Sequence, residues 1–167
     1  MMEVKDAVLN LEKSDVFKKF KKDYPDAYLA NLFSMIDEKS PIPEWHIGYY
    51  DKSKERIITF VLGDEIIQNP ESEVFRDGGH VEHIEMHKIK ISFDKAIENA
   101  IIHQKQKYPI DSPTKKIVLV QNIDGHYMYN MTFVTQTFKT LNIKVSTQDG
   151  RIISSKIYSI FDFDKKD

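Results

Sequence analysis

Apolar positions recur in the two halves of the chain at one constant offset. Tyr24-Pro25 aligns with Tyr108-Pro109 at a shift of 84 positions, and the alignment continues without a gap through the patterns that follow. In the first half the aligned positions are Phe33, Met35, Trp45, Ile47, Tyr49, Ile57, Thr59 and Val61. Their counterparts are Ile117, Leu119, Tyr129, Met131, Phe133, Leu141, Ile143 and Val145. A fixed period of this kind indicates one structural unit present twice.

The clearest helix pattern begins at Ser92 in the second half. Ser92 is a good N-cap, because its hydroxyl can accept a hydrogen bond from a backbone N–H of the first turn. Asp94 follows in that turn, where the helix dipole favours a negative charge. Pro109 ends the pattern. The apolar stripe at helical spacing consists of Phe93, Ala96, Ile97, Ala100 and Ile101.

The first half has a less regular helix pattern that ends at Pro25. Its apolar face consists of Val16, Phe17, Phe20 and Tyr24. Three further apolar residues at helical spacing precede Ser14, namely Val4, Val8 and Leu11. They either extend this helix backward or form a separate one.

Strand patterns follow each helix. Runs with alternating or β-branched apolar residues cover 28–36, 45–50 and 56–62 in the first half. The second half has runs at 116–123, 127–133, 141–145, 151–154 and 157–163. Asp124-Gly125 and Asp149-Gly150 are turn signals between them. Each half therefore predicts one helix followed by three or four antiparallel strands.

These patterns predict an α+β fold of two repeated units, each with one helix packed on a small antiparallel sheet. The predicted units are residues 1–84 and 85–167, with the linker at 69–79. In the second unit we expect the helix residues Phe93, Ile97 and Ile101 to be buried. Their expected partners on the sheet are Ile117, Leu119, Met131 and Ile143.

Composition excludes several classes of protein. The chain of 167 residues has 24 basic and 26 acidic side chains, so no strong field of one sign would attract nucleic acid or an anionic membrane. It contains no cysteine, which excludes disulfides, thiolate nucleophiles and cysteine metal sites. No apolar run approaches the roughly 20 residues of a membrane span, and residues 1–10 lack the apolar core of a signal peptide. These features predict a cytoplasmic protein without a membrane span.

Two segments of the second half resemble a known domain. Residues 91–97, Ile-Ser-Phe-Asp-Lys-Ala-Ile, resemble the opening of a PepSY domain, where a strand end meets a capped helix. Residues 145–153, Val-Ser-Thr-Gln-Asp-Gly-Arg-Ile-Ile, resemble its closing hairpin, with an acidic residue and glycine at the turn. The first half resembles a degenerate copy, with Glu65-Ile66 in place of Asp149-Gly150. The resemblance implies a small α+β module that binds or restrains partner proteins and has no catalytic residues.

The segment 80–87 is the strongest candidate for chemistry. It contains three histidines and two glutamates, namely His80, Glu82, His83, Glu85 and His87. Imidazole and carboxylate groups suit zinc and similar ions. If the segment is a strand, His83, Glu85 and His87 share one face and are the candidate metal ligands. The alternative, which we favour, is a polar linker with solvated histidines and no bound metal.

Six aromatic residues form a second candidate set, on corresponding strands of the two units: Trp45, Tyr49, Tyr50, Tyr127, Tyr129 and Phe133. Exposed on a sheet, they could form a surface that binds peptides or bases. The simpler interpretation is that the aromatic residues that alternate along the strands form the core face beneath each helix.

Together these patterns predict a non-enzymatic module for protein interaction or regulation, without a cofactor. No glycine-rich phosphate loop, nucleophile elbow or His-Glu-x-x-His motif is present in the sequence. The expected partner is another protein or a second copy of the chain, bound along a sheet edge or an exposed apolar patch. We expect no deep pocket that gathers His, Asp or Glu from both units. The alternative is a small-ligand or metal-binding protein, with or without hydrolytic activity, that uses His80 to His87.

Overall fold

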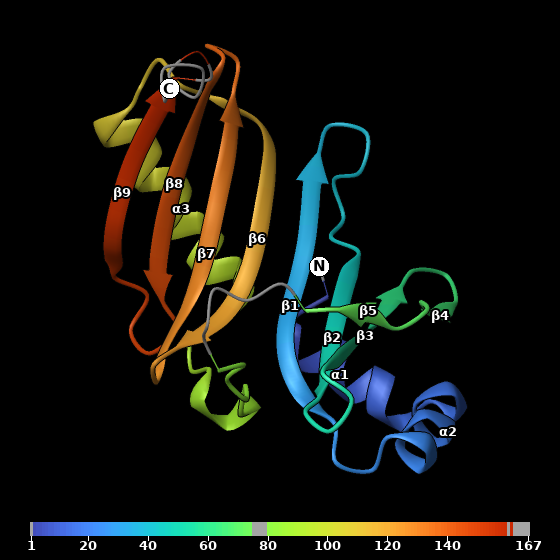
Figure 1. Cartoon of the computed structure of the whole chain (residues 1–167). Coiled ribbons are helices and arrows are strands. Elements are labelled where there is room, and N and C mark those ends of the chain that lie inside the picture. Colours follow the sequence, from blue (N-terminus) through green and yellow to red (C-terminus); the bar gives the residue numbers. More distant parts are fainter. Residues whose placement is uncertain (1, 75–79, 160, 162–167) are drawn as a thin grey trace.

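The computed structural model describes residues 2–74, 80–159 and 161. Its strands form one antiparallel sheet of nine strands in the order β4-β3-β2-β1-β6-β7-β8-β9, and β5 also pairs with β3 (Figure 1). The first half contributes β1 (Tyr28–Asp37), β2 (Trp45–Asp51), β3 (Arg56–Leu62), β4 (Ile66–Gln68) and β5 (Ser72–Glu73). The second half contributes β6 (Pro113–Ile123), β7 (His126–Thr135), β8 (Lys139–Ser146) and β9 (Ile152–Ser159). The single strand β9 takes up most of the run expected at 151–154 and the first part of the run expected at 157–163, and residues 160, 162 and 163 lie outside the described residues.

The expectation of two repeated α+β units, each with one helix on its own small sheet, is wrong. β1 and β6 pair antiparallel, residues 32–37 with residues 115–120, and join all the strands into one sheet. Two separate sheets would leave the facing edges of β1 and β6 with unpaired N–H and C=O groups, which tend to pair with another strand. The boundary expected between residues 84 and 85 lies between β5 and the short 3₁₀-helix η1 (Met86–Lys88).

The helices are α1 (Val4–Lys13), α2 (Asp15–Asp23) and α3 (Phe93–Lys107). α1 is a separate helix, because Ser14 ends it and then caps α2, accepting a hydrogen bond from Phe17 N at 3.2 Å. Ser92 caps α3 as expected and accepts from Lys95 N at 3.2 Å. α2 and α3 each end two residues before a proline, Pro25 and Pro109.

All three helices lie on one face of the sheet (Figure 1). The side chains that face them alternate along the strands and are buried, for example Ile47 on β2, Val118 on β6 and Met131 on β7. Phe93 is fully buried against them, as expected, but Ile97 and Ile101 are only partly buried. Ile117 and Leu119 lie on the opposite face, where they pair with Met35 and Phe33 of β1, so their expected contact with α3 is wrong.

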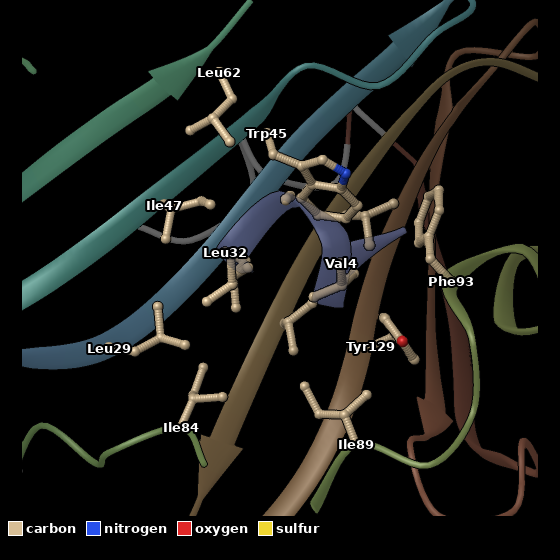
Figure 2. Packing of buried hydrophobic residues seen from close by; sticks show 14 of the residues in the cluster. Val4, Leu29, Leu32, Trp45, Ile47, Leu62, Ile84, Ile89, Phe93 and Tyr129 are labelled. Atoms are coloured by element: carbon tan, nitrogen blue, oxygen red, sulfur yellow. The ribbon is translucent and has the colours of Figure 1, made fainter. Parts of the chain in front are cut away.

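One continuous core runs beneath the helices of both halves (Figure 2). Trp45, the single tryptophan, is 1% exposed, and its ring lies edge-on to Phe93 with centroids 5.1 Å apart. Trp45 Nε1 donates to the carbonyl of Met2 at 3.0 Å. The N-terminal residues, β2 and α3 therefore meet around one indole ring.

Glu3 supplies α3 with a second cap from a distant part of the chain. Its carboxylate accepts from the backbone N–H groups of Phe93 at 2.7 Å and Asp94 at 3.2 Å. A negative charge at this end of a helix is favourable, because the dipole and the unpaired N–H groups point toward it. The first residues of the chain thus hold the helix of the second half.

Candidate functional site

The segment that connects the two halves passes between β1 and β6 where these strands separate. Ile84 N donates to Leu29 O of β1 at 2.8 Å, and Asn122 Nδ2 of β6 donates to His83 O at 3.0 Å. The Tyr127 hydroxyl on β7 also donates to His83 O, at 3.2 Å, and accepts from Glu85 N at 3.0 Å. We call residues 81–89 the wedge segment, because it lies where β1 and β6 no longer pair, with one backbone hydrogen bond to β1 and bonds to side chains of β6 and β7.

The wedge segment is anchored by apolar side chains. Ile84 and Ile89 are each 1% exposed and belong to the core (Figure 2). The histidines around them are exposed to solvent: His80, His83 and His87. The segment is therefore a packed element with a polar outer surface.

The candidate metal ligands do not converge. His83 lies beside the ring of Tyr28, with ring centroids 5.4 Å apart, and His87 lies in η1. Glu85 forms an ion pair with Lys88 at 2.6 Å, and that hydrogen bond and charge lower the pKa of the Glu85 carboxyl. Across the described ranges, no three His, Asp or Glu side chains are grouped so that they could hold a metal ion.

The wedge segment instead forms one wall of a cavity of about 680 Å³. α1, α2, the start of β1 and the end of β2 complete the walls. The cavity is lined by Lys5, Val8, Leu9, Glu12, Phe17, Lys21, Ala27, Tyr28, Leu29, Tyr49, His83, Ile84, Glu85, Met86 and His87. Its titratable residues include Glu12 and His83 from the first predicted unit and Glu85 and His87 from the second. The cavity thus gathers such residues from both units, but it is open to solvent and is not the deep pocket that the prediction concerned.

Tyr49 is the buried polar group of this cavity. It is 3% exposed, and its hydroxyl donates to Glu12 Oε1 at 3.3 Å. Burial, and then the negative charge and hydrogen bond of Glu12, raise the pKa of Tyr49. The hydroxyl is therefore a fixed donor at neutral pH, and Glu12 is held toward the cavity.

The six aromatic residues singled out in the sequence are all buried: Trp45, Tyr49, Tyr50, Tyr127, Tyr129 and Phe133. All but Tyr50 belong to the core cluster beneath the helices. The Tyr129 hydroxyl donates to Ile91 O at 2.7 Å, and burial raises the pKa of that hydroxyl. None of the six offers an exposed ring to a peptide or a base.

The two edges of the sheet differ. At one edge β4 and β5, of three and two residues, cover parts of β3, and Arg56 forms an ion pair with Glu73 at 3.2 Å. At the other edge lies β9, a strand of eight residues. Within the described part of the chain, no strand pairs along the outer side of β9.

Sequence reasoning missed most of the cavity. Its apolar walls come from positions that were interpreted as ordinary core or as linker, notably Ile84. The signal that could have located the wedge segment is the pair of apolar residues Ile84 and Ile89 within an otherwise polar stretch. Leu29 lies in the strand pattern at 28–36, but nothing in that pattern indicates a cavity.

Comparisons with known proteins give one likeness in fold. No model of a protein family matches the chain, and no curated protein matches it. Its structure is similar to the crystal structure of "a putative lipoprotein (CD1622) from Clostridium difficile 630", with a TM-score of 0.60 and 13% sequence identity. The alignment covers 94% of this chain and 93% of that one. At this identity the likeness concerns the fold alone.

A membrane helix is absent from the part of the chain that the structure describes. None of its helices is both long and apolar enough to cross a bilayer.

Proposed function

We propose that the protein is a non-enzymatic binding module that pairs with a strand of a partner protein along β9. The observation that carries the proposal is the length and composition of this edge. Residues 154–159 of β9 pair in register with residues 139–144 of β8. Within residues 154–159, Lys156 is the single charged residue.

Natural sheets protect long edges with charges, prolines, bulges or short strands. The β3 edge follows this practice, since two very short strands and the Arg56–Glu73 ion pair cover it. β9 has one irregularity near its start, between Ile152 and Ser154, and is regular after it. A long edge with little protection suits the addition of a partner strand, where main-chain hydrogen bonds supply the affinity.

β9 is also held firmly from behind. His103 Nε2 on α3 lies 2.8 Å from Ser155 Oγ, and the Tyr108 hydroxyl lies 3.3 Å from the same oxygen. Burial, and then the charge of Lys107, lower the pKa of His103, which favours the neutral imidazole. A rigid edge loses little conformational entropy when a partner strand binds, which favours affinity.

The test is affinity capture from cells of the source organism with the intact chain as bait. A double variant, Ser154→Lys with Tyr158→Lys, adds two charges to the exposed side of β9. The matched control, Ile67→Lys, adds a charge to β4 at the opposite edge, where Ile67 is 56% exposed. We expect the wild type and the control to retain a specific partner and the double variant to lose it.

Hydrogen exchange of the reconstituted complex then locates the contact. Strand addition predicts that amide protons of residues 152–159 exchange at least about tenfold more slowly in the complex, because new hydrogen bonds protect them. Equal capture by the double variant, or protection confined to another surface, would contradict the proposal.

The PepSY resemblance supports a binding role of the same kind, because such modules bind or restrain partner proteins. The binding role is a proposal, and so is the cytoplasmic location expected from the sequence. Cell fractionation with an antibody to the chain tests the location.

A further inference from the structure

The cavity between α1, α2 and the wedge segment has the size of a small-molecule site. Its volume of about 680 Å³ lies within the roughly 300–1,000 Å³ typical of ligand pockets. It is remote in the sheet order from β9, because its walls come from β1 and β2. A ligand here would therefore be independent of the partner proposed for that edge.

The floor of the cavity is apolar and the rim is polar. Phe17, Leu29 and Ile84 line the floor and are 8%, 5% and 1% exposed. Lys5 and His87 lie at the exposed rim. This arrangement fits an amphipathic molecule, with an aliphatic body inside and a polar head at the rim.

The charges at the rim decide the sign of the head group. Lys5, Lys21, His83 and His87 provide basic nitrogen atoms, whereas the acidic groups are Glu12 and Glu85. Glu85 is paired with Lys88 at 2.6 Å, whereas Glu12 accepts a hydrogen bond from the neutral Tyr49 hydroxyl, which adds no compensating charge, so two lysines face one uncompensated carboxylate. Lys21 Nζ donates to two neutral carbonyls, of Pro25 at 2.9 Å and Ala27 at 3.0 Å. The balance favours an anion.

We propose that this cavity binds an aliphatic carboxylate of medium chain length. The chain lies over the apolar floor, and the carboxylate lies near Lys5 and the exposed histidines of the wedge segment. Lys5 supplies the charge-assisted hydrogen bond, since Lys21 already donates to backbone carbonyls.

The test is isothermal titration of the full chain with decanoate and, separately, with decylamine. The two probes share an alkyl chain and differ in the sign of the head group. We expect decanoate to bind at one site and decylamine to bind at least about tenfold more weakly. Lys5→Gln should weaken decanoate binding by about tenfold, the size expected for a lost charge-assisted hydrogen bond. Lys19→Gln, at an exposed lysine of α2 outside the cavity, is the matched control and should leave binding unchanged.

Backbone amide shifts measured by NMR place the ligand. Shifts on decanoate addition should concentrate in α1 and in residues 83–87. Three results would overturn the proposal: no saturable binding of decanoate, equal or tighter binding of decylamine, or shifts centred elsewhere. Unchanged affinity in Lys5→Gln would also overturn the assignment of the head group.

Discussion

At the scale of single residues, a few side chains hold together parts of the fold that are far apart in the chain. Glu3 accepts from backbone groups 90 and 91 residues later, at the start of α3. Trp45 contacts both the N-terminal residues and Phe93. Tyr129 holds the carbonyl of Ile91 just before the same helix. The N-terminus of α3 is thus fixed by three separate segments.

Glu3→Ala should lower the free energy of unfolding by about 1 kcal/mol, as the loss of a helix cap does. Glu3→Gln should cost less, because its amide oxygen still accepts a hydrogen bond while the charge is lost. The measurement is urea unfolding followed by the fluorescence of Trp45. Glu38→Ala, at an exposed acidic residue after β1, is the control and should change the stability by less than about 0.5 kcal/mol. Equal stability of Glu3→Ala and the control would show that this cap contributes nothing.

At the scale of elements, the wedge segment departs most from what its composition suggests. A stretch rich in His, Glu and Lys indicates a solvated linker, yet Ile84 and Ile89 are buried as deeply as the strands beside them. Its backbone also donates one hydrogen bond to β1 and accepts one from the Asn122 side chain of β6. The wedge segment is therefore part of the core.

Ile84→Ala should cost about 2–5 kcal/mol, the range for large-to-small changes at buried sites. The matched control is Ile102→Ala on α3, where the side chain is 45% exposed and the change should cost well under 1 kcal/mol. Both are measured by chemical denaturation at one pH. Similar small costs for the two variants would mean that the segment is only loosely attached.

Local signals predicted many elements but not their assembly. The Ser92 cap is a local feature and was found, as was the Asp124-Gly125 turn, where both residues have positive φ. The run at 117–120 is apolar at every position, so alternation could not say which side chains face the helices. The pairing of β1 with β6 depends on two segments far apart in the chain, and no local pattern encodes it. The cavity follows from that assembly and was missed with it.

At the scale of the whole molecule, the continuous sheet is the premise of the proposed function. Because β1 and β6 pair with each other, only the edges at β9 and at β3 to β5 remain available in the described structure. If the halves formed separate sheets, β1 and β6 would each offer a further edge. A partner strand could then pair with β1 or β6 as well as with β9. Both the fold and the proposed binding at β9 therefore depend on the pairing of β1 with β6.

A disulfide cross-link between β1 and β6 tests this pairing most directly, because the chain has no cysteine of its own. Met35 and Ile117 are direct partners, so Met35→Cys with Ile117→Cys places two Cβ atoms about 4.5–5.5 Å apart. Thr132 is the next partner across the sheet, about 10 Å from Met35 at the usual strand spacing, so Met35→Cys with Thr132→Cys is the control. Mass spectrometry after mild oxidation of the folded protein should find the first pair cross-linked and the control pair reduced. A reduced first pair, or equal cross-linking of the two pairs, would contradict the continuous sheet.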